Sequence, residues 1–68
     1  MARLGQALRQ VRHERGWRQV DLAAASGLTQ KYISEIESGR VDPRWSVICR
    51  LTSALGVSVG HFYVDPSK

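Results

Sequence analysis

The stretch RHERGWRQVDLAAASGLTQKYISEIESGR, from Arg12 to Arg40, decides the fold. It holds two segments with helical patterning, Gln19–Ala25 and Thr29–Ser38. A short Ser-Gly-Leu connection joins them, and its Gly27 can adopt a positive φ. Two helices joined by a short turn that contains glycine form a helix-turn-helix unit. A generic helical hairpin has the same outline, so this spacing alone does not identify a helix-turn-helix unit.

The second helix of this unit has two different faces at helical spacing. The apolar face consists of Tyr32, Ile33 and Ile36, with Glu37 at its edge. The polar face consists of Lys31, Ser34, Glu35 and Ser38, with Gln30 exposed at the N-terminus. These polar side chains can hydrogen-bond the edges of DNA bases, and a helix N-terminus attracts phosphate. A merely solvated polar face would show the same pattern.

The rest of the chain predicts three more helices and no strand. A first helix over about Ala2–Arg15 has an apolar stripe and ends at Gly16, which suits a left-handed cap. A fourth helix begins with Asp42 as N-cap and Pro43 in its first turn. Its expected buried stripe is Trp45, Ile48, Leu51 and Leu55. A short fifth helix starts at Ser58. The predicted fold class is all-α, a compact domain of five helices.

Length, composition and charge restrict the class of protein. The 68 residues, 43% of them hydrophobic, suit one small folded domain that spans residues 1–68. The net charge is +4, and the arginines gathered before Gln19 favour nucleic acid as a polyanionic partner. No apolar run is long enough for a signal peptide or a membrane span, so we expect a cytoplasmic protein with no membrane partner.

The sequence offers no catalytic, metal or cofactor site. Its single cysteine, Cys49, cannot form an intramolecular disulfide and is expected to lie in or beside the core. The two histidines, His13 and His61, are too far apart in sequence for metal-ligand spacing. No nucleophile–base pair, carboxylate pair or phosphate loop occurs, so we expect no enzyme, no metal and no cofactor.

Positions spread over the chain follow one recurring pattern. In the quoted stretch they are Arg12, Gly16, Trp17, Gln19, Leu22, Ala23, Gly27, Thr29, Gln30, Ile33, Glu37, Gly39 and Arg40. Later positions are Pro43, the run ALGVS at 54–58, and Phe62. By this pattern the chain resembles the phage-repressor/Cro-type (Xre-type) helix-turn-helix family over nearly its whole length. The resemblance implies a lambda-repressor-like fold that binds double-stranded DNA and regulates transcription.

The resemblance also implies roles for residues at the DNA surface. The family's base-reading positions are occupied by Gln30, Lys31, Ser34 and Glu35. The residues expected at the phosphate backbone are Arg18, Gln19, Tyr32, Ser38, Arg40 and Arg44. Gln19 is also expected to brace Gln30, and backbone N–H groups near Ser38 to contact phosphate. Core packing is the alternative for Tyr32. Phosphate contacts would set the register, and the recognition helix would select the sequence.

In this family an ion pair joins the first helix to the end of the recognition helix, and its partners here are Arg12 and Glu37. Arg18 departs from the family, which usually has Ser, Thr or Asn at this N-cap, and losing that cap should cost about 1 kcal/mol. Trp17, at an inter-helix corner, and Trp45 are predicted to pack in the core rather than to stack on bases.

A domain of this size reads few base pairs, so we expect a homodimer on two half-sites about one helical turn apart. The expected dimer surface is Val47, Val57, Val59, Phe62 and Tyr63, although these residues could instead close the core. A restriction–modification controller, a Cro-like repressor and an antitoxin with a protein partner all fit. A protein–protein interaction module on the same scaffold is the alternative from another class. We expect a nucleoid-associated protein of a prokaryote or phage.

Overall fold

The computed structural model describes residues 2–58 and 60, and this part of the chain contains four α-helices and no strand. The helices are α1 (Ala2–Glu14), α2 (Gln19–Ser26), α3 (Gln30–Glu37) and α4 (Trp45–Leu55). The all-helical class predicted from the sequence is therefore confirmed, whereas four helices are described instead of five. The predicted fifth helix begins at Ser58 and falls mainly on residue 59 and residues 61–68, outside the described residues.

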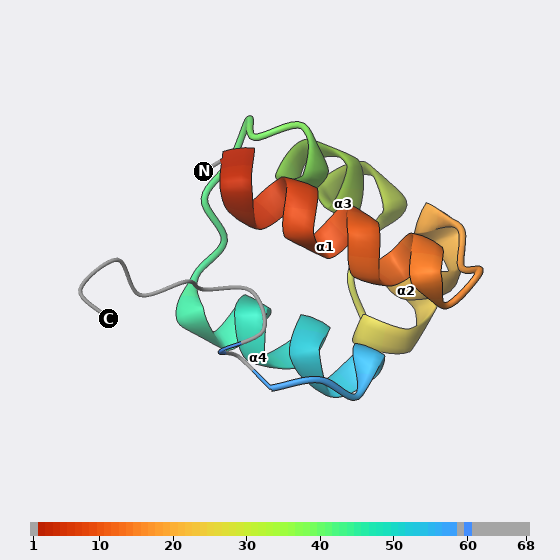
Figure 1. The fold of residues 1–68 in the computed structure, drawn as a ribbon. Coiled ribbons are helices and arrows are strands. Elements are labelled where there is room, and N and C mark those ends of the chain that lie inside the picture. Colours follow the sequence, from red (N-terminus) through yellow and green to blue (C-terminus); the bar gives the residue numbers. More distant parts are fainter. Residues whose placement is uncertain (1, 59, 61–68) are drawn as a thin grey trace.

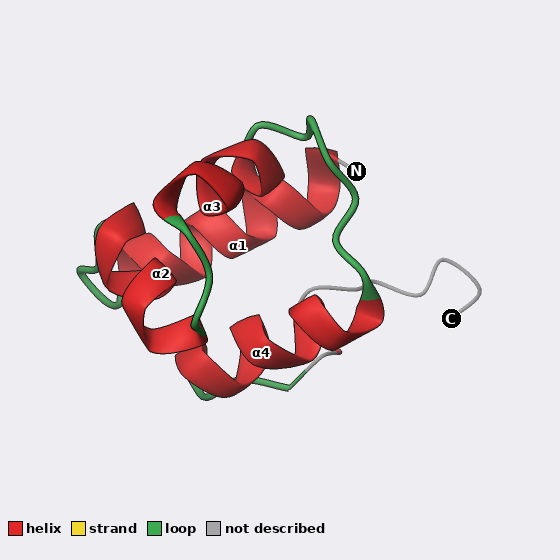
Figure 2. Cartoon of the chain, turned by 180° about the vertical axis from the view of Figure 1, so that it is seen from behind, coloured by secondary structure: helices red, strands yellow, loops and turns green. Residues whose placement is uncertain are grey.

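The helices form two layers around one core. Figure 1 shows α1 lying along α3, with α2 at one end of the pair and α4 on the far side of the core. The view from behind in Figure 2 shows the same arrangement, with α2 between α3 and α4. The connection between α2 and α3 is short, so these two helices are held together as the predicted helix-turn-helix unit.

The core is built from the apolar stripes that the sequence predicts. Its buried members are Leu4, Leu8, Val11, Leu22, Ala23, Ile33, Ile36, Ile48, Leu51 and Leu55. Each large aliphatic side chain buried in this way stabilises the fold by about 1.5–3 kcal/mol relative to leaving it in water. Ile33 and Ile36 belong to α3, so the core itself determines which face of that helix is turned outward.

The ends of α2 and α3 have the local chemistry expected from their residue types. Gly27 ends α2 with a φ of 75°, a left-handed conformation in which its N–H donates to the Ala23 carbonyl. Thr29 is the N-cap of α3, and its hydroxyl accepts a hydrogen bond from the Tyr32 N–H at 3.1 Å. The turn and the start of the recognition helix are therefore as predicted.

The start of α4 differs from the prediction. The helix begins at Trp45, with Arg44 as an extended N-cap, so Asp42 and Pro43 precede it instead of opening it. Trp45 is 63% exposed and does not pack in the core. The buried stripe of α4 consists of Ile48, Leu51, Thr52 and Leu55, so Thr52 belongs to it and Trp45 does not.

A glycine inside α1 allows that helix to approach α3 closely. A β-carbon on Gly5 would lie 2.3 Å from the Ile36 carbonyl oxygen and 2.7 Å from that of Glu37. Glycine in a helix interior costs about 0.5–1 kcal/mol relative to alanine, so its use here reflects the contact. The C-terminal end of α3 is thereby seated directly on the α1 backbone.

Candidate nucleic-acid interface

The outward face of α3 carries the residues expected to read bases. Gln30, Lys31 and Ser34 are exposed, and Glu35 is half-buried. On the inward face, Ile33 and Ile36 are fully buried. The helix therefore presents polar side chains to solvent while its apolar side is anchored, which is the arrangement that a groove-reading helix needs.

Most of the side chains expected at phosphate are accessible to solvent. Arg18, Arg40 and Arg44 are exposed, and Gln19 is half-buried. Tyr32 is half-buried and packs against the core, as in the alternative to phosphate contact given above for this residue. A guanidinium has several N–H donors in a planar fork, which suits a phosphate oxygen well.

The backbone N–H groups near Ser38, which we expected to contact phosphate, already have acceptors within the chain. The Ser38 N–H donates to the Ser34 carbonyl at 3.0 Å, and the Arg40 N–H donates to the Glu35 carbonyl at 2.9 Å. The Ser38 hydroxyl also donates to the Glu35 carbonyl, at 3.1 Å. Because the end of α3 uses these donors itself, the side chains of Arg40 and Arg44 are the ones available to phosphate at this end.

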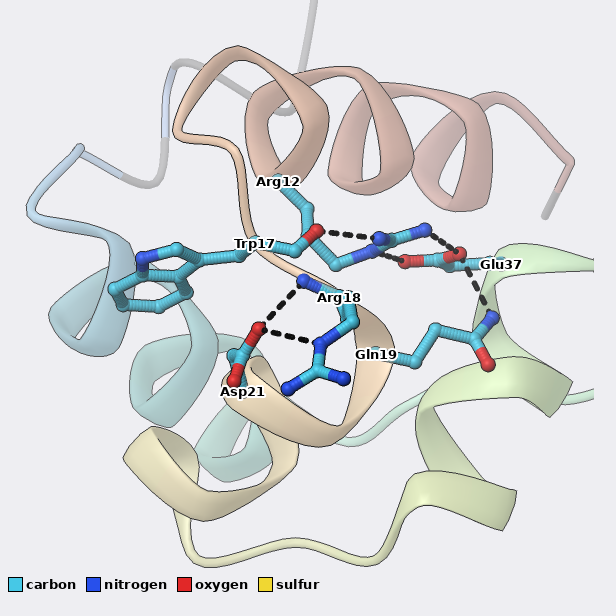
Figure 3. Close-up of polar contacts among 6 residues, drawn as sticks. All are labelled: Arg12, Trp17, Arg18, Gln19, Asp21 and Glu37. Atoms are coloured by element: carbon cyan, nitrogen blue, oxygen red, sulfur yellow. Dashed lines mark hydrogen bonds and ion pairs between the residues drawn. The ribbon is translucent and has the colours of Figure 1, made fainter.

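A buried ion pair ties α1 to the end of α3. Arg12 donates from Nε to Glu37 Oε2 at 2.7 Å and from Nη2 to Oε1 at 3.0 Å. Both side chains are buried, with 7% and 5% of their surfaces exposed. The remaining Arg12 nitrogen, Nη1, donates to the Trp17 carbonyl at 2.7 Å (Figure 3). The pair expected between these residues is therefore present, and it also holds the corner that precedes α2.

Gln19 joins the same network from the first turn of α2. Its Nε2 donates to Glu37 Oε1 at 3.1 Å, and Figure 3 shows its side chain reaching from α2 toward the carboxylate. The expectation that Gln19 braces Gln30 is therefore replaced by this contact. A carboxylate is a stronger acceptor than an amide oxygen, and Glu37 lies within reach.

The start of α2 has a substitute for the missing cap. The Asp21 carboxylate accepts a hydrogen bond from the Arg18 backbone N–H at 2.8 Å, and the Arg18 Nε lies 3.4 Å from the same oxygen. These contacts, the backbone hydrogen bond foremost, lower the pKa of Asp21 below its ordinary value of 3.8. The cost expected from the missing N-cap at Arg18 is thus partly offset. Asp21 thus makes the half of a capping box in which the N3 side chain accepts from the N-cap N–H, while the Arg18 guanidinium cannot supply the other half.

The residues expected at a dimer surface are only partly described. Val47 and Val57 are half-buried and pack against the core. Val59, Phe62 and Tyr63 lie outside the described residues. Cys49 is half-buried, as expected for a boundary residue, in an open groove between the end of α2 and α4.

The described residues contain neither a candidate metal site nor a helix that could span a membrane. Among residues 2–58 and 60, no group of three His, Cys, Asp or Glu side chains could hold a metal ion. In the same part of the chain, every helix is too short or too polar to cross a membrane.

The sequence is similar to those of known transcriptional regulators. Residues 3–61 match the helix-turn-helix domain family. The chain is 36% identical over 64 residues to the HTH-type transcriptional regulator PuuR of Escherichia coli (strain K12), an alignment that covers 94% of this chain and 35% of PuuR. It is 36% identical over 56 residues to the immunity repressor protein of Bacillus phage phi105, covering 82% of this chain and 39% of the repressor. The chain thus spans little more than a third of each of these relatives.

Solved structures share the fold at similar identity. The restriction-modification controller protein C.AhdI from Aeromonas hydrophila superimposes with a TM-score of 0.89 at 31% identity, covering 91% of this chain and 94% of that chain. The clp gene regulator ClgR from C. glutamicum superimposes with a TM-score of 0.84 at 36% identity, covering 91% of this chain and 83% of that chain.

Proposed function

This chain belongs to the phage-repressor-type (Xre-type) helix-turn-helix family of DNA-binding transcriptional regulators, and we propose that it acts by placing α3 in the major groove of a specific duplex. The observation that carries the proposal is the two-sidedness of α3. Its apolar side is anchored in the core by Ile33 and Ile36, while Gln30, Lys31 and Ser34 are all exposed on the other side.

Each polar residue of α3 suits a particular base edge in this proposal. Lys31 can donate to O6 and N7 of guanine, and Gln30 can pair with adenine through its amide. The Glu35 carboxylate can accept from the N4 amine of cytosine. The arginines at positions 18, 40 and 44 would bind phosphate and fix the register, which is a sequence-independent contribution.

Two copies of the chain would bind together, since one short helix reads only a few base pairs. In a two-fold dimer the two α3 helices enter successive major grooves about one helical turn apart. We assign the contact between copies to Val47 and Val57 together with Val59, Phe62 and Tyr63, as expected from the sequence. A sedimentation profile that stays monomeric at tens of micromolar, with and without DNA, would rule out this arrangement.

The test of the proposed function begins with selection of tight-binding duplexes from a randomised pool. Fluorescence anisotropy then compares the selected duplex with a scrambled one at two salt concentrations. We expect much tighter binding to the selected duplex and an affinity that falls steeply with salt, because phosphate neutralisation releases counterions. Recovery of no consensus, with no binding even at low salt, would reject DNA binding and favour the protein-interaction alternative.

Lys31→Ala tests the reading of one base pair. We expect a loss of about 1–3 kcal/mol at the base pair that Lys31 contacts, with substitutions of that pair no longer discriminated. Arg9→Ala is the matched control, since Arg9 is exposed on α1 and the change removes the same charge. Anisotropy on a panel of singly substituted duplexes measures both. A uniform loss across the panel would reassign Lys31 to the phosphate backbone.

A role as a restriction–modification controller is the second candidate, favoured by the near-complete overlap with the C.AhdI chain. Under this proposal the selected sequence should occur upstream of a restriction or modification gene. Its occurrence only elsewhere in the genome would exclude the role and leave the more general regulator.

A further inference from the structure

The amide of Gln19 is held in one orientation by an acceptor that cannot donate. Its Nε2 lies 3.1 Å from Oε1 of Glu37. The Glu37 carboxylate also accepts two hydrogen bonds from Arg12, one at each oxygen. An ionised carboxylate has no proton to give, so the reverse orientation would set the Gln19 carbonyl oxygen against a negatively charged oxygen. The chemistry of Glu37 therefore determines which end of the amide faces inward.

The rest of the Gln19 amide remains available at the surface. An amide nitrogen has two N–H groups, and Glu37 uses one of them. No buried side-chain nitrogen or oxygen in the described part of the chain lacks a hydrogen-bond partner, and Gln19 is half-buried. Its side chain makes no other hydrogen bond to the described residues, so the second N–H is left for an acceptor outside this part of the chain.

The backbone that carries Gln19 is held by the same ion pair. Arg12 Nη1 donates to the carbonyl of Trp17 at 2.7 Å, two residues before Gln19. Arg12 and Glu37 thus restrain both the start of α2 and the side chain that projects from it. Since Glu37 and Arg12 are both buried, an effect of Glu37 on DNA binding would be indirect, and Gln19 is its half-buried hydrogen-bond partner.

We infer that Glu37 is a positioning residue for DNA binding, which orients the Gln19 amide so that one N–H donates to a backbone phosphate. This inference rests on the proposed function, because it concerns the same surface. The buried ion pair then has two roles, one in the stability of the fold and one in the affinity for DNA.

A double-mutant cycle tests the coupling. Gln19→Ala is made in the wild-type chain and in Arg12→Met/Glu37→Leu, which removes both charges and strands neither. Thermal melts followed by circular dichroism establish that all four proteins are folded at the assay temperature. We expect Gln19→Ala to weaken binding to the selected duplex by about tenfold in the wild type, as for one hydrogen bond to a charged group. In the double-variant background we expect less than about a twofold loss, because the amide is no longer oriented.

Two features of the loss would identify a phosphate contact. It should be the same on the selected duplex and on singly substituted duplexes, and the salt dependence should not change, because Gln19 carries no charge. An equal loss in both backgrounds would overturn the inference, as would no loss in the wild type. Failure of the wild-type chain to bind any duplex would instead reject the proposed function.

The wild-type protein provides a second measurement that does not depend on the double variant. The side-chain amide of Gln19 gives two proton resonances in nitrogen-resolved NMR spectra. We expect one of them to shift when the selected duplex is added and the other, bound to Glu37, to stay in place. A shift of neither proton, or an equal shift of both, would contradict the assigned orientation.

Discussion

The starts of α2 and α4 are built from similar residues, yet their surroundings differ. Each helix has an arginine N-cap in an extended conformation, Arg18 and Arg44, and neither side chain caps its helix. Each arginine also has a tryptophan beside it in the sequence, Trp17 or Trp45. From the sequence, both tryptophans were predicted to pack in the core.

The difference comes from what lies behind each helix. At α2, Trp17 packs against the core and its carbonyl accepts from Arg12. Figure 3 shows its indole turned away from the ion pair. At α4, Trp45 is 63% exposed. The start of α2 thus meets a buried polar network, whereas the tryptophan at the start of α4 is exposed.

The largest expected effect comes from breaking that network. Glu37→Ala leaves the Arg12 guanidinium buried without its partner, which should cost about 3–5 kcal/mol of the free energy of unfolding. Urea denaturation measures it. Arg12→Met/Glu37→Leu is the control, and we expect it to cost less, about 1–2 kcal/mol, because neither charge is stranded but the Trp17 carbonyl loses its Arg12 donor. If Glu37→Ala lowers the free energy of unfolding by no more than the double variant does, the buried ion pair is not what supports the start of α2.

The next largest effect on stability is expected at Trp17, and Trp45 provides the comparison. We expect Trp17→Ala to cost roughly 2–3 kcal/mol, less than a fully buried aromatic because Trp17 is half-buried. Trp45→Ala should remain within about 0.5 kcal/mol, as for other exposed positions. Equal costs in matched thermal melts would mean that the two helix starts are supported alike.

A smaller effect is expected where α1 supports the end of α3. Gly5→Ala gains helix propensity but sets a methyl group against the carbonyl oxygens of Ile36 and Glu37. We expect a net destabilisation of about 1–2 kcal/mol, because neither backbone can yield easily. Gly60→Ala, where a methyl group would meet only the Ser58 hydroxyl at 3.9 Å, is the matched control. Stabilisation by Gly5→Ala in urea denaturation would show that the two helices can separate.

The smallest effect concerns the charge of Asp21. The pKa of Asp21 is lowered in the folded protein, so its contribution to stability is present above the ordinary value of 3.8 and is lost as the pH falls through the folded value. Asp21→Asn keeps an oxygen that can accept from the Arg18 N–H but removes the charge. We expect its melting temperature to lie slightly below that of the wild type at pH 7, and the difference to shrink as the pH falls below 3.8. A difference that persists at low pH would show that the charge is not the cause.

The sequence by itself determined the elements and the faces of this protein. Helical spacing predicted the core residues of α1 and α3, and the glycine at position 27 marked the turn between α2 and α3. These features depend on neighbours a few residues apart, so periodicity and backbone preference are enough to reveal them. The partners Arg12 and Glu37 came from the family pattern, which carries information about contacts distant in the sequence.

Only the tertiary structure decided how the helix starts and the polar contacts are supported. The exposure of Trp45 depends on where the core ends, and the requirement for glycine at position 5 depends on how closely α1 lies to α3. The partner of Gln19 was likewise decided by the packing, since Gln30 was expected from the sequence and the structure has Glu37. Burial and hydrogen-bond partners belong to the packed chain and not to a segment, so these features emerge only when the helices come together.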